Sequence, residues 1–151
     1  MNVTRKRNGK VFTVYRGKPG NSKLNSYKNQ AYNLVNSSVA HQRNRFNKYL
    51  AIRNRNYVLI NKTNPNKLLG FATMKNTNGV NGLALIGTVP WRQGYGRMLM
   101  NVIRNNARKR GSHTVRVLSV APSAQAFYRV LGYTPVNNHK YNWHRRVNNA
   151  K

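Results

Sequence analysis

The distribution of apolar residues along the chain predicts alternating strands and helices. Short apolar or alternating segments rich in β-branched and aromatic residues predict β-strands, and turn-forming Gly, Asn and Pro separate them. The predicted strands are residues 11–15, 57–60, 68–74, 83–89, 114–120, 133–136 and 140–147. The segments 57–60 and 68–74 are joined by an Asn/Pro turn and form a predicted hairpin. Residues 83–89 are apolar on both faces, which is typical of an interior strand.

Apolar residues at helical spacing predict three helices. They occupy residues 31–50, 94–110 and 122–131. Gly111 and Gly132 follow the second and third of these segments, where glycine commonly ends a helix. Pro122 is suited to the first turn of the third helix.

These elements predict one mixed α/β (α+β) domain over residues 11–151, with a twisted sheet of about six to seven strands flanked by helices. Helix 94–110 connects strand 83–89 to strand 114–120, and crossovers of this kind join parallel neighbours. We therefore expect strand 83–89 to be central and parallel to strand 114–120. Residues 1–10 are interpreted as a basic arm. No apolar segment reaches the roughly 18 residues that a membrane-spanning helix needs.

The net charge changes this picture of an ordinary domain. The 151 residues include 28 Lys and Arg but no Asp or Glu, which gives a formal charge of +28. Acidic residues normally make up roughly an eighth of a protein, so chance does not explain their absence. Screened self-repulsion on the order of tens of kcal/mol rivals a typical stability of about 5–15 kcal/mol. A bound polyanion would remove this penalty. We therefore expect a nucleic acid or an acidic protein or membrane surface as partner.

The basic residues form short clusters in several predicted elements. Sequence-specific DNA-binding proteins concentrate base contacts on one element, so this distribution indicates neutralisation of phosphate backbones without sequence preference. The candidate polyanion-binding residues are Arg5, Lys6, Arg7, Arg43, Arg45, Lys48, Arg104, Arg108, Lys109, Arg110, Arg145 and Arg146.

A candidate phosphate site lies where strand 83–89 leads into the GYG turn of residues 94–96 and the following helix. Backbone amides and the helix dipole favour an anion there, and glycine lets a pyrophosphate approach the backbone closely. About thirty residues downstream, residues 122–136 read PSAQAFYRVLGYTPV. The two motifs and their spacing resemble those of the GNAT superfamily of N-acetyltransferases.

This resemblance implies acetyl-CoA as the cofactor. In GNAT enzymes the glycine turn holds the pyrophosphate and the preceding strand lines the pantetheine arm. The resemblance assigns Gln93, Gly94, Tyr95, Gly96 and Arg97 to the pyrophosphate and Ile86, Gly87 and Thr88 to the arm. It assigns Tyr128 as the general acid that protonates the departing CoA thiolate, with a packing role in the core as the alternative.

The absence of carboxylates bears on the chemistry. Many GNAT enzymes deprotonate the acceptor amine through a carboxylate or a water that a carboxylate holds. His41, His113, His139 and His144 are the alternative candidates for a base. We expect acetyl transfer to be slow or absent even if CoA binds. No metal site is expected, and the lack of Cys excludes thiolate ligands.

Three functions remain open on the sequence. The main prediction is a GNAT-fold protein repurposed as a structural or packaging component, such as a minor capsid or nucleoprotein component of a virion or another nucleic-acid-rich particle. The acid-free composition favours this reading, because a freely diffusing, non-secreted enzyme has no need to lose every carboxylate. The alternatives are an active acetyl-CoA-dependent N-acetyltransferase and a ribosomal or other nucleic-acid-binding protein. CoA binding and turnover separate the three.

Overall fold

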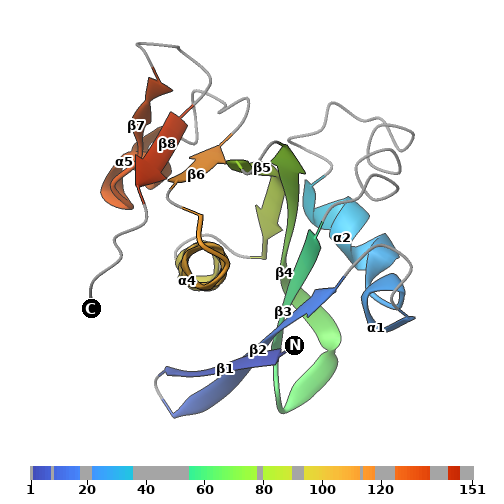
Figure 1. The fold of residues 1–151 in the computed structure, drawn as a ribbon. Helices are drawn as coiled ribbons and strands as arrows, with labels where there is room; N and C mark the ends of the chain where they lie inside the picture. The colour runs from blue at the N-terminus through green and yellow to red at the C-terminus, as the bar shows by residue number, and fades with distance from the viewer. Residues whose placement is uncertain are drawn as a thin grey trace.

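One mixed β-sheet with helices on both faces forms the molecule (Figure 1). The computed structural model describes residues 2–7, 9–17, 22–35, 55–77, 80–89, 94–112, 114–117, 125–136 and 143–146. The strands are β1 (Asn2–Arg7), β2 (Lys10–Gly17), β3 (Arg55–Asn61), β4 (Asn64–Thr77), β5 (Val80–Thr88), β6 (Thr114–Val117), β7 (Thr134–Pro135) and β8 (Trp143–Arg146). The helices are α1 (Ser22–Asn25), α2 (Lys28–Val35), α4 (Tyr95–Lys109) and α5 (Gln125–Val130). The predicted fold class is confirmed.

The sheet order within the described part of the chain is β1-β2-β3-β4-β5-β6-β8-β7. Strands β1 to β5 pair antiparallel with their neighbours, so the predicted hairpin of β3 and β4 is confirmed. β5 pairs with β6 in parallel, with Asn81 opposite Val115 and Leu83 opposite Val117. The predicted central position of β5 and its parallel neighbour are therefore both confirmed.

The N-terminal segment differs from the expectation of a basic arm. Asn2–Arg7 forms β1, which pairs with β2 from Asn2 opposite Tyr15 to Arg7 opposite Lys10. Gly9, with φ of 74°, lies in the tight turn between them. The basic side chains obscured this strand, because main-chain pairing at a sheet edge needs no apolar pattern. β1 is also the strand by which the sheet exceeds the six or seven expected.

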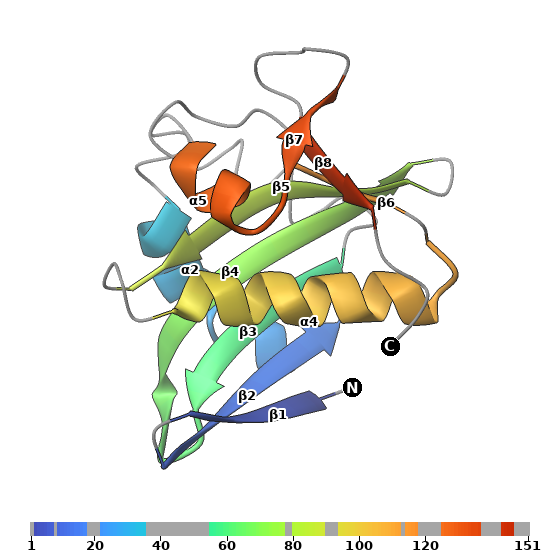
Figure 2. The same ribbon diagram turned by 90° about the vertical axis from the view of Figure 1, so that its left-hand side faces the viewer.

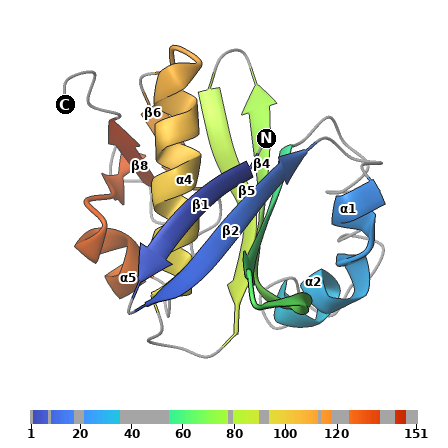
Figure 3. The ribbon, with the colours of Figure 1, turned by 90° about the horizontal axis from the view of Figure 1, so that it is seen from below.

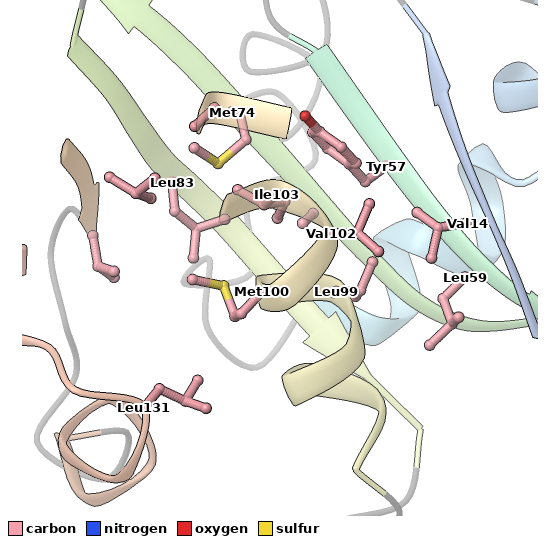
Figure 4. Packing of buried hydrophobic residues seen from close by; sticks show 14 of the residues in the cluster. Val14, Tyr57, Leu59, Met74, Leu83, Leu99, Met100, Val102, Ile103 and Leu131 are labelled. Atoms are coloured by element: carbon pink, nitrogen blue, oxygen red, sulfur yellow. The ribbon is translucent and has the colours of Figure 1, made fainter. Parts of the chain in front are cut away.

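Two hydrophobic cores lie on opposite faces of the sheet. α4 and α5 cover one face (Figure 3). The larger core lies there and includes Leu99 and Ile103 (Figure 4). Tyr128 belongs to the same core. α1 and α2 cover the other face, where Leu24 and Ala31 pack on the smaller core. The sheet is thus buried on both sides, which explains why β3 and β5 have apolar residues on both faces. The predicted helix 31–50 corresponds in part to α2, and its remainder lies outside the described residues.

A polar pair is buried between β3 and β4. Asn56 and Thr73 are register partners, and Thr73 Oγ1 donates a hydrogen bond of 3.0 Å to Asn56 Oδ1. Both residues are buried. A buried acceptor that loses its donor keeps its desolvation penalty. Thr73→Val preserves the shape of the side chain but removes the donor, so it should lower the free energy of unfolding by about 1–3 kcal/mol in urea titrations.

The exposed β3–β4 turn offers a matched control for this substitution. Thr63 Oγ1 donates to Asn61 Oδ1 at 2.9 Å, but this pair is exposed to solvent. Thr63→Val should therefore change the free energy of unfolding by less than about 0.5 kcal/mol. Equal losses in the two variants would show that burial of the Asn56–Thr73 pair has no energetic consequence.

Candidate functional site

α4 begins with a glycine in the left-handed conformation. Gly94 is its N-cap, with φ of 77° and ψ of 11° and no side-chain capping hydrogen bond. The first intrahelical bond runs from the Met98 amide to the Gly94 carbonyl at 3.0 Å. The amides of Tyr95, Gly96 and Arg97 therefore have no acceptor within the helix. Together with the positive end of the helix dipole, they form an anion cradle.

The second glycine of the turn accommodates α5. A Cβ placed on Gly96 would lie 2.9 Å from Cζ of Phe127, which is shorter than real Cβ contacts allow. The Phe127 ring therefore packs directly on the first turn of α4. The Tyr95 ring points elsewhere and packs on Phe12 of β2 at a centroid distance of 5.8 Å. Tyr95 thus contributes its backbone amide to the cradle and its ring to the core.

The end of β5 lies against the same helix. A Cβ on Gly70 of β4 would meet Leu99 Cδ1 at 2.8 Å and Thr88 Cγ2 at 3.2 Å, so this glycine lets α4 pack closely on the sheet. Ile86, Gly87 and Thr88 are half-buried and pair with β4. They lie beyond the described parallel ladder of β5 with β6, which covers Asn81–Leu83. Their β6-facing edge therefore lies outside that described ladder.

Tyr128 follows Phe127 on α5 and belongs to the larger core. Its side chain is 4% exposed. Its ring lies edge-on to Phe127 at 5.0 Å and to Tyr133 at 5.7 Å. Burial, and to a smaller degree Tyr133, raises the pKa of the Tyr128 phenol above its ordinary value. The hydroxyl therefore remains protonated at neutral pH, as a general acid must.

Most of the predicted cofactor residues fall within the described part of the chain. Residues 86–88 end β5, residues 94–97 begin α4, and the Tyr128 ring contacts that of Phe127. Gln93 lies outside the described residues, as do His41, His113 and His139. His144 is on β8, opposite Arg116 of β6.

The predicted polyanion-binding residues are distributed over three elements. Arg104 and Arg108 are half-buried on α4, and Lys109 and Arg110 are exposed at its end. Lys6 is exposed on β1 and Arg145 is half-buried on β8. Arg5 and Arg7 belong to β1 and Arg146 to β8, whereas Arg43, Arg45 and Lys48 lie outside the described residues.

Sequence reasoning missed two residues of this site. An isolated glycine inside a strand often marks close approach of another backbone, so Gly70 carried a usable signal. The contact of Phe127 with Gly96 had no signal at the level of sequence, because it depends on how α5 packs against α4.

Residues 23–147 match the family model described as the acetyltransferase (GNAT) domain. The chain therefore belongs to the GNAT acetyltransferase family, as the two motifs predicted. By sequence alone, no curated protein matches the chain significantly.

Solved structures of GNAT proteins share the fold at low sequence identity. The chain is similar to Tetrahymena GCN5, with a TM-score of 0.76 and 12% identity over 93% of this chain and 98% of that one. It is similar to the ribosomal-protein-S18-alanine N-acetyltransferase of Escherichia coli, with a TM-score of 0.66 and 18% identity over 91% of this chain and 96% of that one. It is also similar to a GNAT acetyltransferase from Brucella melitensis in complex with acetyl-CoA, with a TM-score of 0.62 and 16% identity over 89% of this chain and 88% of that one.

The described residues contain no cluster of three or more His, Cys, Asp or Glu that could hold a metal ion. Among them there is also no helix with the length and hydrophobicity to cross a membrane.

Proposed function

We propose that the protein is an acetyl-CoA-dependent N-acetyltransferase. The observation that carries this proposal is the cradle, which follows the end of β5 and consists of the αL Gly94 and the first-turn amides of α4 that have no acceptor within the helix. A side chain at residue 96 would collide with Phe127. Membership of the GNAT family and the acetyl-CoA bound to the Brucella relative support the same activity.

The residues of the site suit the parts of acetyl-CoA. The amides of Tyr95, Gly96 and Arg97 would bind the pyrophosphate, and Ile86 to Thr88 would line the pantetheine arm through the β5 edge. When bound, the cofactor supplies an activated acetyl thioester. Tyr128 Oη holds the proton that the departing thiolate requires. Because its ring is fixed between Phe127 and Tyr133, this hydroxyl loses little conformational freedom on binding.

The acid-free composition constrains the acceptor amine. No side-chain carboxylate can remove its proton, since the chain has none. The surrounding positive charge favours the deprotonated acceptor amine, because like charges lower the pKa of an ammonium group. The favoured acceptor is therefore an amine that is neutral near pH 7, on a molecule that is itself neutral or anionic. A polyamine would be repelled.

The packaging role and the localisation in a virion or other particle stay predictions of the composition. The comparisons favour the enzymatic reading, because the family model and the similar structures are acetyltransferases. The expectation of slow transfer also stays a prediction, and it is tested together with the proposed activity.

Calorimetric titration with acetyl-CoA, in salt high enough to suppress non-specific attraction, tests the proposal. One-to-one binding is expected. Gly96→Val should weaken it at least about tenfold, because the new methyl groups displace Phe127 and block the backbone. Lys109→Val adds the same β-branched side chain at an exposed position in the last turn of α4. It should leave affinity within about twofold. Absence of binding, or equal loss in both variants, would contradict the assigned cradle.

A further inference from the structure

Two groups of arginines include residues from the C-terminal half of α4. The first, named the β3 arginine group, consists of Arg16 on β2, Arg55 on β3 and Arg110 at the end of α4. The second, named the β8 arginine group, consists of Arg104 and Arg108 on α4 and Arg145 on β8. The end of β2, the start of β3, the end of β8 and the C-terminus of α4 gather on one side of the molecule (Figure 2).

The β3 arginine group is positioned by the packing of α4 on the sheet. Tyr57 Oη accepts a hydrogen bond of 2.8 Å from Asn106 Nδ2, which joins β3 to the last turns of α4. Arg16 is the register partner of Tyr57 on the neighbouring strand. Partial burial, followed by the charges of Arg110 and Arg16, lowers the pKa of Arg55. The three cations are therefore close enough to repel one another.

Two members of the β8 arginine group, Arg104 and Arg145, lie close to the buried Tyr133. Arg145 is fixed, because its Nη1 donates a 2.6 Å hydrogen bond to the Leu131 carbonyl. Partial burial and the charges of Arg145 and Arg108 lower the pKa of Arg104, while Tyr133 opposes this shift. Tyr133 is only 2% exposed, and its hydroxyl has no hydrogen-bond partner in the described structure. A donor without an acceptor thus lies beside these cations.

No acidic side chain balances these charges, because the sequence contains no Asp or Glu. The C-terminal end of α4 offers a partial charge of only about −0.5 from the helix dipole. The charge of each group of three guanidinium ions exceeds this partial charge several-fold. The charge that neutralises this face must therefore come from the solution, either as small counterions or as a bound polyanion.

We propose that this face binds the phosphate backbone of a double-stranded nucleic acid. Arg108 and Arg110 are two residues apart, so they project about 160° from each other, on opposite sides of a helix that is about 10–12 Å wide with its side chains. The major groove of a duplex places two rows of phosphates at a comparable separation of about 12 Å. The planar, forked guanidinium also pairs with phosphate oxygens in a bidentate manner.

The scarcity of exposed aromatic rings among the described residues favours a duplex over a single strand. Proteins that bind single strands stack bases on exposed aromatic rings. The large hydrophobic side chains exposed in the described structure are Phe127 and Val130, and both belong to α5. Among the described residues, the arginine face therefore has no such stacking platform. Binding is expected to depend on the backbone and to be independent of sequence.

Fluorescence anisotropy with a labelled duplex DNA of about 20 base pairs tests this proposal across a range of salt concentrations. The variant Arg55→Gln/Arg104→Gln/Arg110→Gln removes cations from both groups but leaves the Arg145–Leu131 bond. If each arginine contacts one phosphate, the slope of log K against log salt becomes shallower by about 2 to 3. Affinity in roughly 0.1 M salt then falls by about 100- to 500-fold.

A second triple variant removes the same charge from the opposite end of the sheet. Lys10, Lys62 and Lys67 are exposed at the start of β2, in the β3–β4 turn and on β4. Their replacement by Gln should make the slope shallower by less than about 1. Equal effects of the two triple variants would overturn the proposal, because they would show attraction to the overall charge alone.

Two further measurements test whether misfolding causes the loss and whether an acidic protein binds as well as the duplex. The replacement of the same three arginines by lysine retains charge and should restore most of the salt slope, which excludes misfolding as the cause of the loss. A polyglutamate peptide of equal charge should bind at least about tenfold more weakly than the duplex. Equal or tighter binding of polyglutamate would show that the face is suited to an acidic protein and would overturn the nucleic-acid proposal.

Discussion

Replacement of Tyr128 by phenylalanine is expected to lower kcat for acetyl transfer by about 10²- to 10⁴-fold, the usual contribution of a positioned general acid. The ring is buried and packs edge-on against Phe127 and Tyr133, so the phenylalanine ring fills the same volume. Affinity for acetyl-CoA should stay within about twofold. The measurement is thiol release from acetyl-CoA with neutral peptide and anionic amine acceptors, together with calorimetric affinity.

Tyr133→Phe is the matched control for this experiment. It removes a hydroxyl from the neighbouring buried tyrosine, and that hydroxyl has no hydrogen-bond partner in the described part of the chain. Its kcat should stay within about threefold of the parent. Because burial raises the pKa of Tyr128, the parent rate should show no alkaline decline from its ionisation below about pH 10. Unchanged turnover in Tyr128→Phe would instead assign Tyr128 to packing alone.

Leu99→Ala is expected to lower the free energy of unfolding by about 2.7–5 kcal/mol, the range for a fully buried leucine. Leu99 is 0% exposed, and its Cδ1 packs over Gly70 at the centre of the contact between α4 and the sheet (Figure 4). This is a large fraction of a typical stability of about 5–15 kcal/mol. Urea unfolding followed by circular dichroism measures the loss.

Val130→Ala serves as the reference for Leu99→Ala. Val130 is 71% exposed on α5, so its truncation should change the free energy of unfolding by less than about 0.5 kcal/mol. A loss below about 1 kcal/mol in Leu99→Ala would mean that α4 does not pack on the sheet as described. The anion cradle would then lack the support that positions it.

The elements with strong periodicity and clear glycine ends were predicted closely. The predicted helix 94–110 corresponds to α4 at Tyr95–Lys109, because its apolar face and both end signals are local. The N-terminal part of β4 was assigned to a turn because Asn64 and Pro65 are typical of loops. It is nevertheless a strand, next to register shifts at Leu59/Ile60 and Ile60/Asn61 that no local pattern encodes.

The candidate site was predictable only where its signals are local. Gly94 and Gly96 mark the cradle in the sequence, whereas the fit of Phe127 against Gly96 requires the packed helices. The gathering of arginines beside α4 was also not predicted. Arg16 and Arg55 are far apart in the sequence, and the pairing of β2 with β3 brings them to the same end of the sheet.

The position of β1 at the sheet edge bears on how the protein behaves at high concentration. Of the strands described, β1 pairs only with β2, and its sequence includes Arg5, Lys6 and Arg7. Edge-to-edge association of two copies would bring these rows within a strand spacing of about 4.8 Å. Repulsion acts over about 8 Å in physiological salt but over only about 3 Å at 1 M. The charge on β1 therefore disfavours edge-to-edge aggregation, and concentrated salt weakens that protection.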